Sequence, residues 1–205
     1  NQLRATVLAM RAIRRVNPAA RLVQTEDLGR IYSTPELACQ AELENERRFV
    51  TWDLLCGRVD FESPFIQLLL RAGIRRDELQ WFADNPSPPD LIGINHYITS
   101  DRFLDHRLQH YRGLAAGGNG LCRYVDVEAV RVRPELHDGW RRSLSEAWER
   151  YRLPIAITEA HLGCTRDEQL RWLGEAWAAA CEARASGIDV RAVTAWSLLG
   201  SYDWN

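Results

Sequence analysis

The chain contains no lysine, because all 26 of its basic residues are arginine. Chemistry that needs a lysine amine of the protein's own is therefore excluded, including Schiff-base aldolases, covalent pyridoxal-phosphate enzymes and P-loop phosphate binders. The sequence also lacks a run of about 18 apolar residues and a basic-then-apolar start. We expect neither a membrane-spanning helix nor a signal peptide.

Positive and negative side chains are nearly equal in number, and the formal net charge is −2. This balance provides no field that would attract nucleic acid or an anionic membrane. The five cysteines are an odd number, widely spaced and without a Cys-x-x-Cys pair, which favours reduced thiols in a cytoplasmic protein. With 205 residues, 46% of them hydrophobic, the chain is long enough for one globular domain with its own core.

Helical and strand-like segments alternate along the chain. Helices are expected over 3–16, 35–57, 139–151 and 165–187, and short apolar strands over 22–25, 91–97, 154–160 and from 189 onward. In the first helix the expected buried stripe is Leu3, Val7, Met10 and Ile13; in the last it is Leu170, Leu173, Trp177 and Ala180. Thr165 and Glu168 form a capping box at the start of that last helix. Strands separated by helices predict a parallel α/β sheet.

The least regular stretch is "HRLQHYRGLAAGGNGLCRY", for which we predict a surface loop. Its glycines lack the following helix that a phosphate-binding loop requires. His106 and His110 lie four residues apart near two aspartates and are an alternative zinc pair on a helical face, although exposed histidines on an arginine-rich face are the expected interpretation. His161 and Cys164 form a His-x-x-Cys pair, but no partner pair for it is visible. The sequence therefore predicts no metal site and no cofactor.

Polar and aromatic residues follow each predicted strand. The carboxyl ends of parallel strands form the functional edge of α/β sheets and barrels, so these side chains are expected to converge. Carboxylate, amide and phenol groups beside indole rings suit a sugar site, in which the indoles cover the apolar face of the ring. The residues concerned are Glu26, Asp27, Asn95, Tyr97, Glu159, Trp196 and Trp204.

Three segments resemble motifs of glycoside hydrolase family 1, the retaining β-glucosidase-like enzymes. "DLIGINHYITS" is similar to the family's sixth-strand motif, Asp-Phe-Ile-Gly-Ile-Asn-Tyr-Tyr, and "PIAITEA" to the seventh-strand Pro-Ile-Tyr-Ile-Thr-Glu-Asn-Gly. "GIDVRAVTAWSLLGSYDWN" resembles the eighth-strand motif that contains Ala-Trp-Ser-Leu-Leu and ends in Glu-Trp. The three occur in the family's order, and "FVTWDLLCGRVDFESPF" resembles the stretch before the sixth strand.

The resemblance implies a role for each matching residue. Glu159 is implied to be the catalytic nucleophile, Tyr97 to hold it by a hydrogen bond, and Asn95 to lie beside the acid/base position. The implied substrate-binding residues are Trp196, Trp204, Asp203, Glu26 and His96. Asp203 replaces the family's usual glutamate and has a shorter reach, and His96 replaces a tyrosine. Ala160 and His161 replace Asn-Gly after the nucleophile.

The family's acid/base glutamate lies in an Asn-Glu-Pro motif, and that tripeptide does not occur here. The resemblance therefore implies a (β/α)8 barrel of which residues 1–205 cover roughly the fifth to eighth strands, truncated at both ends. Glu26 or Asp27 is an alternative second carboxyl group. Open strand edges would be covered by self-association or by an N-terminal half.

The function implied is retaining cleavage of a glycosidic bond, with the acid outside this chain and a small carbohydrate or glycoside as the partner. The alternative is a non-catalytic or weakly active sugar-binding domain, attached to a sugar-nucleotide reductase of the dTDP-4-dehydrorhamnose type.

Overall fold

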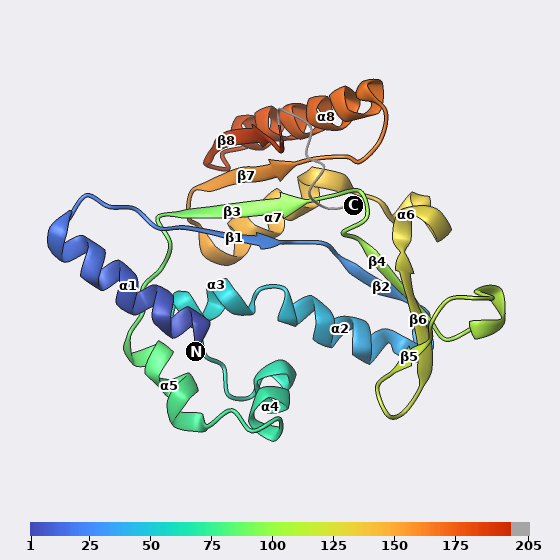
Figure 1. Ribbon diagram of the computed structural model, residues 1–205, viewed down its shortest axis with the longest axis horizontal. Coiled ribbons are helices and arrows are strands. Elements are labelled where there is room, and N and C mark those ends of the chain that lie inside the picture. The colour runs from blue at the N-terminus through green and yellow to red at the C-terminus, as the bar shows by residue number, and fades with distance from the viewer. Residues whose placement is uncertain (198–205) are drawn as a thin grey trace.

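A parallel four-stranded sheet with the order β1-β3-β7-β8 forms the centre of the computed structural model, which describes residues 1–197 (Figure 1). Short segments that contain β-branched residues form these strands, and helices lie in the connections between them; all three pairings are parallel. The strands are β1 (Val23–Asp27), β3 (Leu91–His96), β7 (Ile155–Ala160) and β8 (Val190–Ala195). The expected parallel α/β architecture is confirmed.

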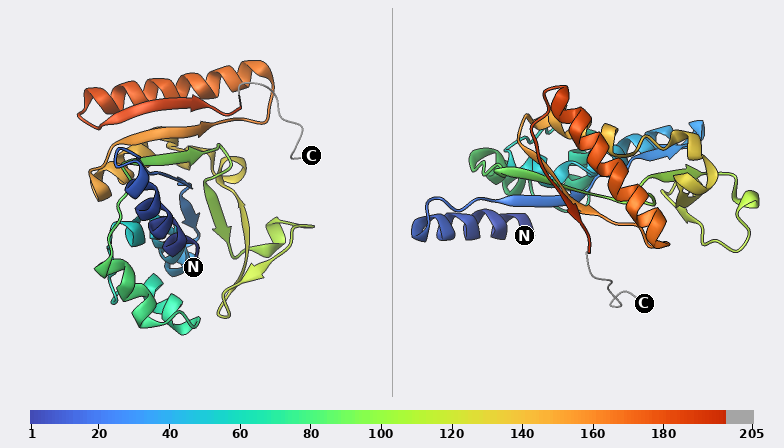
Figure 2. Two further views of the ribbon diagram at one scale, coloured as in Figure 1. Left: turned by 60° about the vertical axis from the view of Figure 1, so that its left-hand side comes forward. Right: turned by 90° about the horizontal axis from the view of Figure 1, so that it is seen from above.

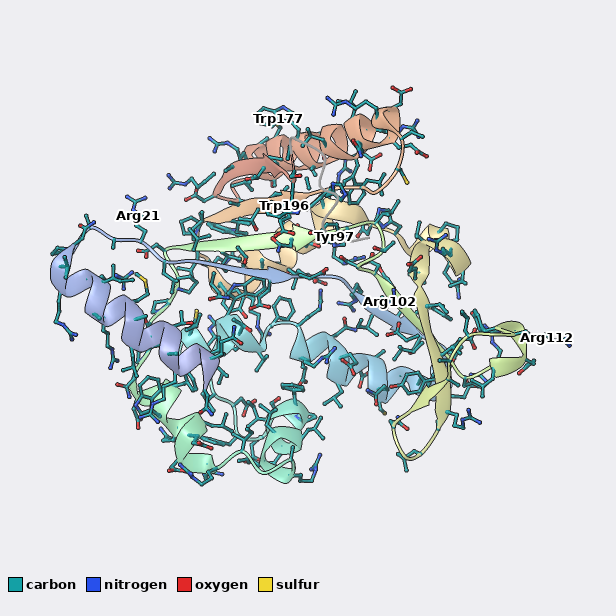
Figure 3. All side chains as sticks on the ribbon, viewed as in Figure 1. Arg21, Tyr97, Arg102, Arg112, Trp177 and Trp196 are labelled. Atoms are coloured by element: carbon teal, nitrogen blue, oxygen red, sulfur yellow. The ribbon has the colours of Figure 1, made fainter. Side chains whose placement is uncertain are left out.

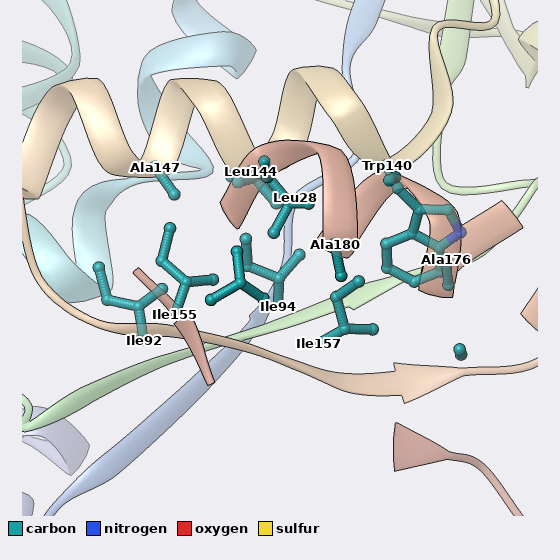
Figure 4. Close-up of a cluster of buried hydrophobic side chains, with 14 of the residues drawn as sticks. Leu28, Ile92, Ile94, Trp140, Leu144, Ala147, Ile155, Ile157, Ala176 and Ala180 are labelled. Atoms are coloured by element: carbon teal, nitrogen blue, oxygen red, sulfur yellow. The ribbon is translucent and has the colours of Figure 1, made fainter. Parts of the chain in front are cut away.

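Helices cover one face of this sheet. Alternate strand residues, among them Ile92, Ile94, Ile155 and Ile157, are fully buried against the helices (Figure 4). The helices within residues 1–197 are α1 (Gln2–Val16), α2 (Ala38–Arg47), α3 (Val50–Leu55), α4 (Pro64–Arg71), α5 (Arg76–Asp84), α6 (Ala129–Val132), α7 (Gly139–Tyr151) and α8 (Arg166–Ala185), with 3-10 turns at Pro35–Leu37, Leu108–His110 and Pro134–Leu136. Of these, α3, α7 and α8 contribute the residues of the core on this sheet.

The last helix starts where its capping box predicts. The Thr165 side chain accepts from the Glu168 backbone N–H, and the Glu168 carboxylate accepts from the Thr165 backbone N–H. The expected buried stripe is confirmed at Ala180, which is buried, and at Leu173, which packs against the core, but it is wrong at Leu170 and Trp177, which are exposed. Small residues allow α8 to approach the sheet closely, and the side that packs carries Trp172, Ala176, Ala179, Ala180 and Ala183. In α1, similarly, Val7 and Met10 are buried but Ile13 is exposed.

The expected helix over 35–57 is divided in two. The α-helical pattern stops at Arg47 and resumes at Val50, and the intervening turn inserts Phe49 into the main core. Trp52 of α3 is fully buried, and its indole N–H donates to the Gln24 carbonyl oxygen of β1 at 3.1 Å. The break therefore lets one segment both follow the second sheet and pack against the first.

A second sheet borders the stretch 106–124, which is mostly irregular as expected and contributes only residues 117–118 and 123–124 to strands. Its order is β2-β4-β6-β5, formed by β2 (Ile31–Ser33), β4 (Arg102–Asp105), β6 (Arg123–Glu128) and β5 (Gly117–Gly118). Val125 and Val127 alternate with polar residues in β6 and pack on Phe103 of β4. Two glycines of the glycine-rich stretch form β5, which pairs antiparallel with β6. This second sheet lies beyond the ends of β1 and β3 (Figure 1).

The main sheet has two outer edges. Within residues 1–197, β1 pairs only with β3, and β8 pairs only with β7. Figure 2 shows the sheet as a curved layer with α8 against β8 at one end. Among these described residues, no helix is both long and apolar enough to cross a membrane.

Candidate functional site

The ends of three neighbouring strands bring polar residues into one row. In the pairing registers Asp27 of β1 lies beside Asn95 of β3, and Asn95 lies beside Glu159 of β7. The register shifts at Ile94/Asn95 and again between Ile157 and Ala160. These irregularities re-aim the last residues of both strands, as bulges commonly do next to functional sites.

Tyr97 and Glu159 are in direct contact. The phenol of Tyr97, which follows β3, donates a hydrogen bond to Oε2 of the half-buried Glu159. Figure 3 labels Tyr97 at the end of β3. Burial raises the pKa of the Tyr97 phenol well above its usual value, and the hydrogen bond to Glu159 and the negative charges of Glu159 and Asp27 raise it further. Tyr97 therefore remains a hydrogen-bond donor throughout the neutral range.

Asn95 is oriented by its neighbour on the next strand. The Thr158 hydroxyl donates to the Asn95 side-chain oxygen at 2.7 Å. Gly93 lies two residues before Asn95, on the same face of β3. A Cβ atom added to Gly93 would lie 2.5 Å from Thr25 Cγ2 and 2.9 Å from Thr158 Cγ2. The methyl groups of two threonines thus close over a glycine that has no room for a side chain.

Asp27 is a second carboxyl group on this edge. Its oxygens accept from the Gly29 backbone N–H at 2.8 Å and from the Ser100 hydroxyl at 2.6 Å. Solvent reaches the side chain, but the surrounding protein removes much of its hydration, and this desolvation raises the pKa of Asp27; the charges of Asp101 and Glu159 act in the same direction.

Ser100 links Asp27 to the backbone of Tyr97 and was not among the residues expected from the sequence. Its Oγ accepts from the Tyr97 backbone N–H at 3.0 Å while its hydroxyl donates to Asp27. The turn is closed by the Ser100 N–H, which donates to the Tyr97 carbonyl at 2.9 Å. The signal in the sequence was the hydroxyl-bearing Thr99-Ser100 pair directly after the sixth-strand motif.

Glu26 lies on the other side of the strand from Asp27, because successive residues of a strand point to opposite faces. It lines a hollow of about 500 Å³ between β1 and α2 together with Arg47 and Arg48, and Asp27 and Ser100 reach the rim of the same hollow. Gln24 donates to the Glu26 carboxylate at 3.2 Å. The structure therefore brings Asp27, and not Glu26, to the side that carries Asn95 and Tyr97.

His96 does not reach the strand-end row either, which corrects its expected placement with the substrate-binding residues. The side chain is 0% exposed and packs against Trp140 and Trp172 on the helix side, with ring centroids 5.2 Å and 6.1 Å away. Burial lowers the pKa of His96 to about 4. Neither ring nitrogen has a hydrogen-bond partner among the described residues.

His96, Asp101 and His137 form the one group within residues 1–197 whose ligand atoms are close enough to hold a metal ion, all within 4.8 Å of one another. Arg142 already neutralises Asp101, donating to its two oxygens at 3.0 Å and 2.9 Å. The positive charges of Arg142 and Arg48 also disfavour further positive charge at His96. The cluster fits a neutral His96 packed beside the Asp101–Arg142 ion pair better than a divalent cation.

The end of β8 contributes Trp196, whose side chain is 45% exposed. Together with His161 and Leu162, which follow β7, it lines a small cavity of about 80 Å³. Asp203 and Trp204, expected from the sequence to bind substrate, lie outside the described residues. His106, one of the expected alternative metal ligands, instead contacts Thr34 Oγ1 at 2.8 Å through Nδ1 in the second sheet.

The arrangement provides a carboxylate fixed by a phenol at an accessible edge of the sheet. Such a carboxylate can attack an electrophilic carbon or stabilise a positive charge that develops there. Asp27 offers a carboxyl group that holds its proton to higher pH than usual, and Trp196 offers an apolar ring face. Every one of these groups lies at the carboxyl end of a parallel strand, where α/β folds bind their ligands.

Comparisons with solved structures identify the architecture. The AHE enzyme from Alicyclobacillus herbarius superposes with a TM-score of 0.71 at 20% identity, over 98% of this chain and 47% of that chain. A family 1 β-glucosidase from Thermotoga maritima gives 0.69 at 16% identity, over 98% and 46%. The same organism's β-glucosidase in complex with noeuromycin gives 0.72 at 16% identity, over 98% and 47%.

No family model and no curated protein matches the sequence. The chain spans about half the length of the solved structures that it matches. At these identities the likeness concerns the fold. The chain is thus an α/β protein with the architecture of about half of a (β/α)8 barrel.

Proposed function

We propose that this chain carries the nucleophile side of a retaining glycosidase. The observation that carries the proposal is the hydrogen bond from the Tyr97 phenol to Glu159 at the shared strand-end edge. The bond leaves the other oxygen of Glu159 available for reaction. The likeness of the fold to β-glucosidase structures supports a glycoside as the substrate class.

In the proposed reaction Glu159 attacks the anomeric carbon and forms a glycosyl ester, while the bond to the leaving oxygen breaks. A carboxylic acid gives its proton to that oxygen, and water later hydrolyses the ester with the same group acting as base. Tyr97 holds Glu159 in orientation. Asn95 takes a sugar hydroxyl, and Trp196 covers the apolar face of the ring.

We assign the acid to a residue outside this chain. Asp27 holds a proton more readily than an ordinary aspartate, but it stands two strands from Glu159 in the pairing order. Retaining enzymes need two carboxyl groups about 5 Å apart, one of them free to protonate the leaving oxygen, whereas both oxygens of Asp27 are already held, by the Gly29 N–H and the Ser100 hydroxyl. Asp27 is better suited to bind hydroxyl groups of the substrate.

The test uses a 2-deoxy-2-fluoro glycoside with a dinitrophenolate leaving group, which departs without protonation and so needs no acid. Incubation with the folded chain, followed by intact mass and peptide mapping, is expected to show a stable ester on Glu159. The Glu159→Gln variant, which keeps the size and hydrogen bonding of the side chain, should show none. Adduct on another residue, or none with any of several sugar configurations, would contradict the assignment.

A non-catalytic sugar-binding domain is the second candidate, favoured by the two hydrogen bonds that already occupy the oxygens of Asp27, the second carboxyl group on this edge. It predicts saturable glycoside binding with no ester on Glu159 and no release of the leaving group. Attachment to a sugar-nucleotide reductase, which the sequence left open, finds no support among the structures matched.

A further inference from the structure

Tyr97 is held by the turn that follows β3. Its backbone N–H donates to Ser100 Oγ at 3.0 Å, and its carbonyl oxygen accepts from the Ser100 N–H at 2.9 Å. Both backbone groups of Tyr97 therefore bond within the turn, and β3 itself ends one residue earlier, at His96. The direction in which the Tyr97 phenol reaches Glu159 thus depends on how the turn 97–101 is fixed.

Asp101, the last residue of this turn, is a buried charge that the proposed reaction does not use. Its side chain is 1% exposed, and Arg142 of α7 donates to its two oxygens at 3.0 Å and 2.9 Å. The Arg30 backbone N–H, in the connection from β1 to β2, donates to the same carboxylate at 2.7 Å. The Asp101 carbonyl oxygen accepts from the Ala129 N–H at 2.9 Å. One residue therefore ties the turn to three other segments of the chain.

The ion pair of Asp101 is firmly placed. Arg142 belongs to α7, whose Leu144 and Ala147 are fully buried in the main core. Burial by itself would raise the pKa of the Asp101 carboxyl, but the groups that face it, His137 and Arg142 among them, hold this pKa well below its usual range. The carboxylate stays ionised, and its bidentate pairing with a guanidinium fixes geometry as well as charge.

The Asp101 carboxylate also supports the second carboxyl group of the site. Gly29 precedes Arg30, and its N–H donates to Asp27 at 2.8 Å. A Cβ atom added to Gly29 would lie 2.1 Å from the Ser100 carbonyl oxygen, so the two backbones are in close contact there. Ser100 in turn donates to Asp27 at 2.6 Å. Fixing the Arg30 N–H therefore also fixes the two groups that orient Asp27.

We propose that Asp101 is a positioning residue for the Tyr97–Glu159 pair. It acts through the backbone of the turn 97–101 and not by contact with either side chain. With Asp101 bonded to α7 and to the β1–β2 connection, the phenol keeps its direction toward the carboxylate. A purely structural Asp101 would affect the free energy of unfolding but not the contact between Tyr97 and Glu159 in protein that has folded.

The first experiment places fluorotyrosine at position 97 and records its fluorine NMR signal. Glu159→Ala supplies the signal of a phenol without its partner. Asp101→Asn keeps the size of the side chain but leaves Arg142 without its counter-charge, and we expect its signal to move toward that of Glu159→Ala. The control Asp105→Asn replaces an aspartate that is equally buried and bound by an arginine in the second sheet, and it should leave the signal as in wild type.

A second variant covers the case in which Asp101→Asn does not fold. Arg142→Lys keeps a positive charge beside Asp101, but an ammonium group does not reproduce the two parallel bonds of a guanidinium. Its signal should move in the same direction by a smaller amount. Circular dichroism and urea unfolding identify the folded variants. An unmoved signal in folded Asp101→Asn or Arg142→Lys protein, or an equal shift in Asp105→Asn, would overturn the proposal.

The effect on the reaction rests on the proposed function, whereas the fluorine signal does not. Ester formation on Glu159 from the 2-deoxy-2-fluoro glycoside should slow by up to about 100-fold in Asp101→Asn, as misplaced catalytic groups do. Adding Tyr97→Phe to that variant should slow it little further, because both changes disturb one contact. Fully additive losses would overturn the positioning role. An expected fluorine shift without any ester in wild type would refute the proposed function and still support the positioning of Tyr97.

Discussion

The Tyr97 phenol donates its hydrogen bond to Glu159 from the neighbouring strand, so the carboxylate and its donor are fixed by the same parallel pairing of β3 with β7. A hydrogen bond to a charged group contributes about 1.5–3 kcal/mol. Substitution of either residue should therefore change a property that can be measured.

Tyr97→Phe is expected to slow ester formation on Glu159 by about 10- to 100-fold, because the carboxylate loses its orientation. The rate of dinitrophenolate release in the first turnover measures the effect. Tyr111→Phe, which removes a phenol that binds Asp105 in the second sheet, is the control and should leave the rate unchanged. Equal rates for wild type and Tyr97→Phe would show that the bond has no part in the reaction.

Glu159→Gln should lower the pKa of the Tyr97 phenol toward its usual value, since the charge of Glu159 contributes to raising it. Burial raises this pKa most, so the shift should be only partial. Absorbance of phenolate, followed with pH in each protein and corrected with the Tyr97→Phe variant, isolates the signal. A Tyr97 that titrates identically with and without Glu159 would contradict the contact.

Asp27→Asn should stabilise the protein increasingly as pH rises. The folded-state pKa of Asp27 is raised, so folding favours the protonated carboxyl group. The stability that Asp27 contributes is fully present below its unfolded-state pKa of 3.8 and is lost as pH rises through its folded-state pKa. Asparagine carries no such charge. Urea titrations at several pH values measure the free energy of unfolding of wild type and variant. The variant should become more stable relative to wild type as pH rises. A constant difference would mean that Asp27 ionises normally.

Gly93→Ala is expected to destabilise the fold by about 1–3 kcal/mol, because the new methyl group overlaps the methyl groups of Thr25 and Thr158. Thr25→Ser in the same chain removes the nearest of these and should recover part of the loss. Gly174→Ala, with nothing within 4 Å of its Cβ position, should instead stabilise α8 by up to about 1 kcal/mol. Urea unfolding compares the variants, and a harmless Gly93→Ala would contradict the close packing.

His96→Phe should protect the protein against mild acid. Because the folded pKa of His96 is lowered to about 4 from 6.5, wild type loses stability as pH falls from about 6.5, by about 3 kcal/mol at most. Phenylalanine fits the aromatic cluster and takes up no proton. Thermal unfolding between neutral and acidic pH should show a smaller loss for the variant, whereas the control His110→Phe should follow wild type. Parallel profiles for all three proteins would show that His96 is not buried as a neutral ring.

The sequence by itself determined the alternation of strands and helices and the placement of Asn95, Tyr97 and Glu159 at strand ends. These features follow from short-range patterns: apolar runs that end in polar residues, and caps such as Thr165 with Glu168. Their convergence follows from parallel pairing, since all strands of such a sheet end on one side.

Only the tertiary structure decided which face each residue occupies. A shift of one residue moves a strand side chain to the opposite face, and this separated Asp27 from Glu26 and buried His96. The α1 helix has apolar residues on two sides, and α8 packs through alanines, so composition did not reveal that Leu8 and Trp177 remain outside. The second sheet depends on contacts between Phe103, Val125 and Val127, and such non-local packing leaves too weak a periodic signal in short strands to be recognised from sequence.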